Sequence, residues 1–449
     1  MIVNSVCLIN EKQNHSNNIK DFSRIDLSKI DRLRLPDYSS SSTTTNDIEW
    51  KFGSASTIKI LKFIYLDIVS MNANAFNDLP NLQSLHLRFG KPIKEIDLKH
   101  VSSLTELCLE NQTVFAFYQE NLKSKLPSHL EKLSIIGMRL QLKSLKSLEN
   151  LKHLELCELE DLVIGDSSHF NYFKNLTHLK IDTCSFSLKK SFGMDKKTIR
   201  LDLANLEELV LSEVRHFDGK FYFGDLPKLK TLHATNTFEQ IDLASLRSLL
   251  NLRDLEMRPN EDTGRMIHKY NDDDSFWALD ELKDFLNHWP KLNKLNLDGV
   301  DRIDKDLFAN LVDLKNLNLE NCGLEVIHNE SFANLSKLTY LSLSCNGLRE
   351  IDGDTFKALI NLETLDLSGN RELRKFAPDL FEKLNKLKIL KIECCSLKNI
   401  DPFALKDLGN LEELKLSRNK LRDIAAETFV HLKQLKHLYI SKNILMTMN

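Results

Sequence analysis

The chain has 449 residues, 28% of them charged, and 61 Lys and Arg against 64 Asp and Glu give a formal net charge of −3 at pH 7. The two signs are mixed along the sequence, so no basic face for nucleic acid is indicated. No apolar run reaches the length of about 18 residues that a membrane-spanning helix needs, so no membrane-spanning segment is expected.

Residues 1–57 are predicted to form a degenerate N-terminal unit and a polar loop. Ile30, Leu33 and Leu35 keep a weak apolar spacing, and residues 38–57 contain the low-complexity run SSSSTTTND. The start, MIVNSVCLINEKQNH, has no charged segment and only a short apolar patch. It is therefore not predicted to be a secretory signal.

From residue 58 onward, apolar residues recur at a spacing that suits neither an ordinary helix nor an ordinary strand. Leu338, Leu341 and Leu343 precede Asn346, and the same pattern starts again 24 residues away on either side. Within L-x-x-L-x-L, the alternation predicts a short strand with inward leucines and outward x residues. An inward Asn amide can bond backbone groups of the following turn that would otherwise stay buried and unpaired. Because one repeat cannot bury its own apolar face, the repeats are expected to stack and their strands to form a parallel sheet.

About sixteen repeats are predicted over residues 58–449. Their starts include Ile58, Leu82, Leu104, Leu130, Leu151, Leu176, Leu206, Leu229, Leu252, Leu292, Leu314, Leu338, Leu362, Leu411 and Leu435. Insertions are expected near residues 185–200 and 258–289, and the second ends in SFWALDELKDFLNHW, whose apolar spacing predicts an amphipathic helix. The last repeat is truncated at Asn449, which favours a fragment or an incomplete product.

The tandem pattern resembles the leucine-rich repeat (LRR) family, and its 24-residue repeats with an internal Phe, such as Phe332 and Phe356, are similar to the typical class of animal extracellular and receptor proteins. The resemblance covers most of the chain. It implies an α/β solenoid, a horseshoe with a curved parallel β-sheet on the concave face and short helices or turns on the convex face. It further implies a non-catalytic protein–protein recognition module that binds a protein ligand on the concave face, as part of a cell-surface receptor or adhesion protein.

The cysteines support an alternative, a cytosolic LRR scaffold or substrate-receptor subunit. Cys184, Cys322 and Cys395 stand at inward turn positions, where buried reduced thiols are expected. Neither end carries the cysteine cluster with which secreted members of the family usually cap the solenoid. Localisation is thus expected to be extracellular or at the cell surface, with the cytoplasm as the alternative. The N-x-S/T sequences begin at Asn14, Asn111, Asn175, Asn329 and Asn334, and a glycan on Asn111 would obstruct the concave face.

The outward positions of the last repeats are the predicted partner-binding site. They include short side chains, such as Ser342 and Ser344, and a set of larger ones on which binding is expected to depend. Tyr and Arg are expected to be the anchors and the other charged residues to tune specificity. The predicted partner-binding residues are Tyr340, Asp366, Lys391, Glu393, Lys415, Arg418, His437 and Tyr439.

No enzymatic activity and no cofactor are expected, because GxxxxGK[ST], HExxH, GxSxG and CxxC are all absent. A weak metal candidate is the pair His153 and His178, which hold the same outward position in adjacent repeats and are expected about 5 Å apart. Glu155 and Asp182 are further candidate ligands, and two solvated histidines are the favoured interpretation. Residues 272–274, an Asp run, lack the alternating ligands of an EF-hand loop.

Overall fold

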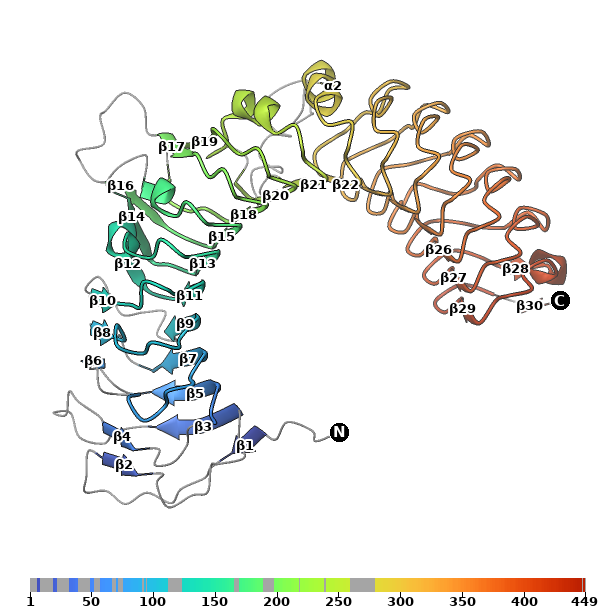
Figure 1. Cartoon of the computed structure of the whole chain (residues 1–449). Coiled ribbons are helices and arrows are strands. Elements are labelled where there is room, and N and C mark those ends of the chain that lie inside the picture. Colours follow the sequence, from blue (N-terminus) through green and yellow to red (C-terminus); the bar gives the residue numbers. More distant parts are fainter. Residues whose placement is uncertain are drawn as a thin grey trace. The chain divides into compact units, whose positions relative to one another are not determined.

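Each L-x-x-L-x-L segment supplies one parallel strand of a solenoid (Figure 1), as the sequence predicts. The computed structural model describes residues 6–8, 19–21, 32–38, 49–51, 57–66, 70–71, 76–90, 93, 95–111, 123–164, 169–188, 198–217, 219–237, 240–258, 279–445 and 447–448. The chain divides into two units: unit 1 comprises Met1–Leu229 and Glu239–Ser248, and unit 2 comprises Lys230–Phe238 and Leu249–Asn449.

In the main sheet of unit 1, each strand pairs in parallel with the next main-sheet strand along the chain. Its strands are β1 (Val6–Leu8), β3 (Arg32–Tyr38), β5 (Ile60–Leu66), β7 (Ser84–Phe89), β9 (Glu106–Asn111), β11 (Lys132–Ile136), β13 (His153–Cys157), β15 (His178–Asp182) and β18 (Glu208–Ser212). From β5 onward, each strand begins two residues after a predicted repeat start. The apolar period therefore locates these strands from the sequence alone.

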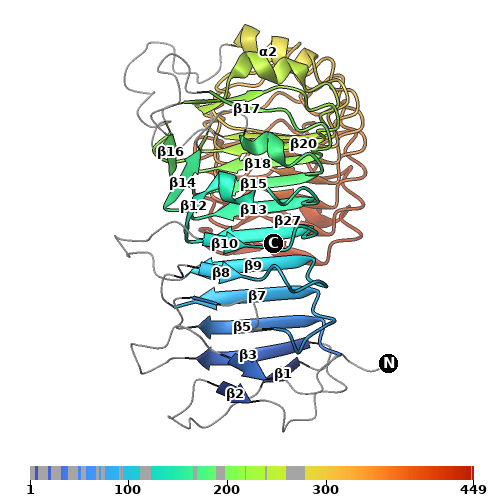
Figure 2. The same cartoon turned by 60° about the vertical axis from the view of Figure 1, so that its left-hand side comes forward.

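The return part of each coil in unit 1 carries further short parallel strands, drawn beside the main-sheet strands in Figures 1 and 2. These strands are β2 (Ile19–Asp21) with β4 (Glu49–Lys51); β6 (Ser70–Met71), β8 (Glu95–Asp97) and β10 (Lys123–Lys125); β12 (Arg139–Gln141), β14 (Asp161–Ile164) and β16 (Phe186–Leu188); and β17 (Thr198–Leu201) with β19 (Lys220–Phe223). Short 3₁₀ helices complete the unit: η1 (Leu142–Leu145), η2 (His169–Tyr172) and η4 (Leu243–Ser248).

The main sheet of unit 2 has the same parallel pairing. Its strands are β20 (Thr231–Thr235), β21 (Asp254–Arg258), β22 (Lys294–Leu297), β23 (Asn316–Asn318), β24 (Tyr340–Ser342), β25 (Thr364–Asp366), β26 (Ile389–Lys391), β27 (Glu413–Lys415) and β29 (His437–Tyr439). The other elements are α2 (Leu279–Asn287), η5 (Ala426–Phe429) and the pair β28 (Asp423–Ile424) and β30 (Thr447–Met448).

The core of unit 2 is a set of apolar columns that run from repeat to repeat. Leu317, Leu341 and Leu365 stand opposite one another in consecutive strands and are fully buried. The internal phenylalanines stack beside them, with ring centroids 6.3 Å apart for Phe308 and Phe332 and 6.2 Å apart for Phe332 and Phe356. Since each side chain fills the space between two coils, apolar burial is a property of the stack and not of a single repeat.

The predicted amphipathic helix is present as α2. Leu282, Phe285 and Leu286 bury one face of the helix, and the Trp289 ring stacks on that of Phe285. Within the described ranges, no helix combines the length and apolar character needed to cross a bilayer. Most of the polar loop predicted at 38–57 and the Asp run at 272–274 lie outside the described residues.

A buried asparagine closes the turn after most of the last strands. Asn370 is completely buried; its Nδ2 donates to the carbonyls of Leu343 (3.0 Å) and Leu367 (2.7 Å), and its Oδ1 accepts from the backbone N–H of Leu348 (3.2 Å). Asn346, Asn419 and Asn443 repeat this arrangement. The amide satisfies backbone groups of the turn, as the sequence predicts, and it also ties each turn to the preceding coil.

Cysteine occupies the asparagine position in some repeats and makes a smaller set of contacts. The thiol of Cys322 points to the carbonyl of Leu297, 3.4 Å away, and that of Cys395 to the carbonyl of Leu367, also at 3.4 Å. Both thiols are buried, and burial raises the pKa of each to about 12. They are thus neutral thiols packed in the core, in agreement with the prediction for these positions.

The convex side of unit 1 holds short helices, as expected, and adds short parallel strands: η1 and η2 lie in the same coils as β12, β14 and β16. One expectation about the coils needs correction. Ser342 and Ser344 were expected to face solvent, but only 2% and 6% of them are exposed. Their hydroxyls lie 3.2 Å apart, within hydrogen-bond distance of one another.

Replacing Asn370 with Ala is expected to lower the free energy of unfolding by about 1–3 kcal/mol, since it leaves buried backbone groups without their partners. Asn370→Cys should cost less, because the thiol can still donate to a carbonyl as in Cys322. Urea unfolding followed by circular dichroism measures both changes. Asn334→Ala, at an exposed position, is the matched control and should change stability by no more than about 0.5 kcal/mol. Equal losses for the Asn370 and Asn334 variants would contradict the role of the buried amide.

Candidate functional site

The main-sheet face of unit 2 displays most of the predicted partner-binding residues in register. Tyr340 lies on β24, Asp366 on β25 and Lys391 on β26, each at an outward position next to a buried leucine. The remaining strand residues are Lys415 on β27 and His437 and Tyr439 on β29. Because consecutive parallel strands lie about 4.8 Å apart, side chains at equivalent positions can contact one another across the sheet.

Asp366 and Lys391 form a cross-strand ion pair at the centre of this face. The two residues are opposite one another in β25 and β26, and the Lys391 Nζ lies 3.2 Å from Asp366 Oδ2. The other carboxylate oxygen, Oδ1, accepts a hydrogen bond of 3.0 Å from the backbone N–H of Ser368. Only 14% of the Asp366 side chain is exposed, so this carboxylate is held in one orientation.

Lys415 links the next two strands. Its ammonium lies 2.9 Å from Glu413 Oε1 on the same strand and 5.3 Å from the centroid of the Tyr439 ring on the neighbouring strand. The Glu413 carboxylate raises the pKa of the Lys415 ammonium. The His437 ring stacks on Tyr439 with centroids 6.5 Å apart. Four of these side chains thus form a small aromatic and ionic cluster at β27 and β29.

The structure does not bring all the predicted residues together. Glu393 follows β26, and its backbone N–H donates a hydrogen bond to Ser368 Oγ at 3.2 Å. Arg418 follows β27 with a φ of 58°, and its exposed side chain has no polar contact recorded within the described residues. Tyr340 is partly buried between Asn316 and Thr364, which stand opposite it in β23 and β25.

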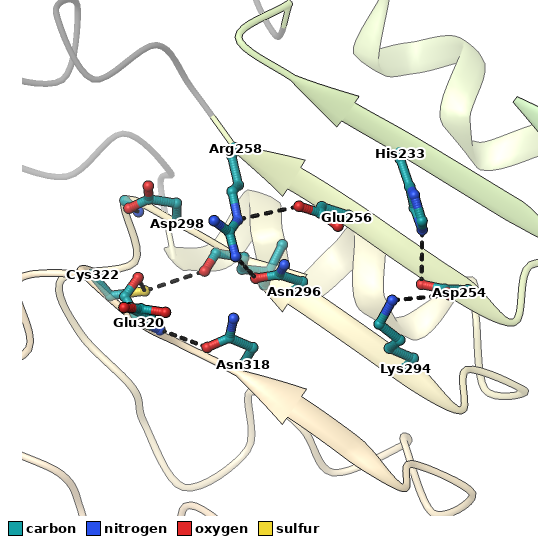
Figure 3. A network of polar contacts seen from close by, with 12 residues as sticks. His233, Asp254, Glu256, Arg258, Lys294, Asn296, Asp298, Asn318, Glu320 and Cys322 are labelled. Carbon is teal, nitrogen blue, oxygen red and sulfur yellow. Dashed lines mark hydrogen bonds and ion pairs between the residues drawn. The ribbon is translucent and has the colours of Figure 1, made fainter. Parts of the chain in front are cut away.

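A second polar network on β20–β22 was missed by the sequence analysis (Figure 3). Asp254 lies between His233 and Lys294, with Oδ1 3.2 Å from His233 Nε2 and Oδ2 3.2 Å from Lys294 Nζ. Burial opposes ionisation of this carboxyl, but His233 and Lys294 outweigh it and hold the pKa of Asp254 below its usual value. The carboxylate is therefore charged and neutralised within the face.

Arg258 completes this network at the other end of the same strands. Its Nε lies 3.3 Å from Glu256 Oε1, and a terminal nitrogen donates to Asn296 Oδ1 at 3.1 Å (Figure 3). The signal was present in the sequence, because the repeat starts Leu229, Leu252 and Leu292 place these residues at outward positions. The sequence does not show which of these neighbouring charged side chains form ion pairs with one another.

The candidate metal pair His153 and His178 is brought together on β13 and β15 of unit 1. The rings stack with centroids 4.2 Å apart and planes 13° apart, so their faces and not their nitrogens meet. Glu155 accepts a hydrogen bond from Ser134 Oγ at 2.7 Å, and Asp182 lies 3.0 Å from Lys180 Nζ. In the described part of the chain, no group of three or more His, Cys, Asp or Glu is arranged to hold a metal ion.

A shallow groove of about 490 Å³ lies in unit 1, beside the residues that directly precede β11, β13, β15 and β18. It is lined by His129, Glu131, Asn150, Lys152, Asn175, Thr177, Asn205, Glu207 and Lys228. Asn150, Asn175 and Asn205 each donate from Nδ2 to a backbone carbonyl of the preceding coil, at 3.2, 2.9 and 3.0 Å. These asparagines thus hold the coils together at this edge, a structural role that the sequence analysis did not assign.

Comparison with known proteins identifies leucine-rich repeats in the C-terminal part of the chain. Residues 290–348, 336–393 and 385–445 match the model of the leucine rich repeat family. Together with the solenoid of parallel strands, these tandem matches support a leucine-rich repeat protein. This family and fold are generally non-catalytic binding modules. A search of curated protein sequences finds no match.

Solved structures with the same fold come from diverse proteins. A leucine-rich repeat protein of Leptospira interrogans is 19% identical with a TM-score of 0.52, over 87% of this chain and 91% of that one. A chain of the Toll–Spatzle complex of Drosophila, in its glycosylated form, is 16% identical with a TM-score of 0.50, over 98% of this chain. The TLR13–ssRNA13 complex is 19% identical over 88% of this chain, with a TM-score of 0.49. This chain covers 61% of the matched Toll–Spatzle chain and 60% of the TLR13 chain.

His153 is expected to titrate below 6.5, the value of an unperturbed imidazole, in a pH series of NMR spectra. Burial lowers its pKa most, followed by the positive charges of His178 and Lys132. Because the unfolded chain binds this proton more tightly, stability is fully present above pH 6.5 and decreases as the pH falls below it. His178→Asn should raise the pKa of His153, whereas His100→Asn, at an exposed position in the same unit, should leave it unchanged. A His153 pKa at or above 6.5 would refute this interpretation of the stacked pair.

Proposed function

We propose that the chain is a non-catalytic recognition module that binds a protein ligand on the main-sheet face of unit 2, as part of a cell-surface receptor or adhesion protein. The observation that carries the proposal is the array of outward side chains that runs in register from Asp254 on β21 to Tyr439 on β29. The array presents aromatic, amide and charged groups on a fixed backbone and forms a broad surface, which suits a protein partner.

The side chains of this face are pre-organised for binding. Asp366, Lys391 and Lys415 are already held in ion pairs, so little side-chain freedom is lost when a partner covers them. Tyr439 and Arg418 extend into solvent beside them and are the residue types on which binding energy concentrates. The likeness to a chain of the Toll–Spatzle complex is consistent with a protein partner.

The cell-surface context rests on where the possible glycan sites lie. Asn329 and Asn334 are exposed on the return part of the coil between β23 and β24, so glycans there would leave the main-sheet face open. Asn111 is only 6% exposed and is a poor acceptor in the folded protein, so the expected obstruction of the face by a glycan does not follow. A secreted module could thus carry glycans without losing its binding surface.

One observation favours the second candidate, a cytosolic scaffold or substrate-receptor subunit. Every cysteine whose surroundings the structure describes is unpaired, including the exposed Cys345 and Cys394. Exposed thiols persist more readily in the reducing cytosol than outside the cell. The intact mass of the protein from its native source separates the two candidates. Mass lost on treatment with a peptide N-glycosidase supports the receptor, and an unglycosylated protein supports the scaffold.

The binding face can be tested with a partner captured from an extract of the native source and then purified. Replacing Tyr340, Asp366 and Lys391 together with Ala is expected to weaken its binding by at least about 30-fold, because the change removes an aromatic anchor and the central ion pair. Isothermal titration calorimetry measures the affinity.

The matched control for this test replaces Asp354 and Lys357, an exposed ion pair of 3.2 Å on the return part of the same unit. Alanine at both positions should change the affinity less than about threefold. If the control weakens binding as much as the face variant, or if the face variant binds normally, the ligand site lies elsewhere on the chain.

A further inference from the structure

The turns that lead into β21, β22 and β23 of unit 2 carry a row of exposed apolar side chains. In each of these turns the N–H of the fourth residue, the leucine that starts the repeat, donates to the carbonyl of the first residue, at 3.3, 3.1 and 3.0 Å. The three turns are residues 249–252, 289–292 and 311–314. The second residue of each turn is apolar: Leu250 is 61% exposed and Val312 is 50% exposed, and the exposed Pro290 lies between them in the stack. These three residues are the apolar row.

Three exposed cations accompany the apolar row. Lys291 is the third residue of its turn, and Arg253 and Lys315 directly follow theirs. The backbone holds Arg253 and Lys315 in equivalent places, because Asn293 in the coil between them donates its N–H to the Arg253 carbonyl and accepts the N–H of Lys315, both at 2.8 Å. Since consecutive strands lie about 4.8 Å apart, the three cations belong to one patch about 10 Å long. The apolar row and these cations together form the apolar–basic edge: Leu250, Arg253, Pro290, Lys291, Val312 and Lys315.

The carboxylates of the same coils are already neutralised. The three stretches of five residues that begin at the apolar row contain two carboxylates, Asp254 and Asp313. Asp254 lies 3.2 Å from the Lys294 ammonium, and Asp313 lies 2.6 Å from that of Lys337 in the next coil. Lys337 lowers the pKa of Asp313 most, and the two cations that follow the turns lower it further. Within the described residues the three cations of the apolar–basic edge form no ion pair, so the edge keeps an excess of positive charge.

The later coils of unit 2 lack this combination. At the positions equivalent to Arg253 and Lys315, the charges are matched, with Glu363 2.8 Å from Lys388 and Glu412 2.7 Å from Lys436. At the place of the apolar row, the later turns carry Ser336, Ile360, Asn385, Gly409 and Lys433. Exposed apolar surface and unpaired positive charge therefore coincide on the coils of β21, β22 and β23.

The two components of the apolar–basic edge indicate the chemistry of its partner. Unpaired cations attract carboxylates, sulfates or phosphates, whereas exposed aliphatic side chains gain free energy when apolar surface covers them. A sulfated polysaccharide carries no apolar side chains, and a single-stranded nucleic acid would stack on aromatic groups, which these three stretches do not contain. The edge also borders the main-sheet face, because Asp254, Lys294 and Asn316 are the next residues along the chain. A polypeptide that carries both acidic and aliphatic side chains fits the edge best.

We infer that the apolar–basic edge is a docking surface for a polypeptide segment with acidic and aliphatic side chains. This inference goes beyond the proposed function, because the edge contains none of the outward strand residues on which that function depends. Binding at the edge weakens as the ionic strength rises, since the cations and the carboxylates of the partner are solvent-exposed before they meet.

The experiment uses the full chain and a displayed library of random linear peptides as the probe. The charge variant replaces Arg253, Lys291 and Lys315 together with Gln. Peptides enriched by the wild-type chain over this variant are expected to contain more Asp, Glu, Leu, Ile and Val than the library. Their affinity, measured by isothermal titration calorimetry, should be at least about 30-fold weaker for the charge variant. For the wild-type chain it should fall at least about tenfold between about 50 and about 500 mM NaCl.

The matched control for the charge variant removes three positive charges elsewhere in unit 2. Lys375, Lys398 and Lys420 are exposed on the return parts of later coils. Replacing all three with Gln should change the affinity for the enriched peptides less than about threefold, because distant exposed charges are screened.

A second variant tests the apolar row and leaves the charges in place. Leu250→Ser combined with Val312→Ser should weaken binding of the enriched peptides at least about tenfold, because it removes the aliphatic surface that they cover. Val326→Ser combined with Val430→Ser, at positions 72% and 65% exposed, is the matched control and should change the affinity less than about threefold. Thermal unfolding of every variant, followed by circular dichroism, shows whether the fold is intact.

Three results would overturn the inference. The first is that the wild-type chain enriches no peptide over the charge variant. The second is that the apolar variant binds the enriched peptides as tightly as the wild-type chain, which would leave the edge a site for any polyanion. The third is that poly(U), heparin or vesicles of phosphatidylserine and phosphatidylcholine bind at the edge more tightly than the peptides, because the edge would then take a nucleic acid, a polysaccharide or a membrane.

The variant with Ala at Tyr340, Asp366 and Lys391 separates this inference from the proposed function. It should bind the enriched peptides as the wild-type chain does, and a loss of peptide binding would place the peptide site on the main-sheet face and overturn the inference. If the same variant binds the captured protein normally, the proposed function fails, whatever the peptides do.

Discussion

The solenoid depends on the satisfaction of backbone groups in the turn that follows each main-sheet strand. At that turn the chain leaves the sheet while still surrounded by its neighbours, so its N–H and C=O groups are buried away from water. Asn370 meets this requirement with one side chain, donating to carbonyls of two coils and accepting from the N–H of Leu348. In these last coils of unit 2, loss of such an amide would leave buried backbone groups unpaired, which is costly.

The repeats with cysteine show how this constraint is shared between neighbours. The Cys322 thiol can donate to the carbonyl of Leu297, but sulfur accepts hydrogen bonds only weakly. The backbone N–H groups of Cys322 and Leu324 are instead both satisfied by Oδ1 of Asn346 in the next coil. Asn346 therefore serves the turn of the coil before it, which compensates for the absence of an amide in the Cys322 repeat.

Much of this could be predicted from the sequence because the physical cause is periodic. Leu338, Leu341 and Leu343 predict one strand and its inward side, and the stacking of repeats then predicts the parallel register. The return strands of unit 1 were not predicted, since β12 and β14 are too short for their alternation to stand out from a turn. The burial of Ser342 was likewise missed, because the alternation of residues gives the side on which a side chain lies but not how far it is covered. For the candidate site, the sequence predicts which residues face outward but not their contacts: Lys415 lies against Tyr439, whereas Arg418 does not join the cluster.

The same rigid register lets charges on the unit 2 face pair across neighbouring strands. Equivalent positions of adjacent strands are close enough for an Asp or Glu to pair with a Lys, Arg or His, as Asp366 pairs with Lys391. Such pairs add little to stability when they are partly exposed. Their greater effect is on specificity, because a competing partner with a charge of its own would have to break a pair or bury an unpaired ion. Where its charges are already paired, the face thus discriminates by exclusion.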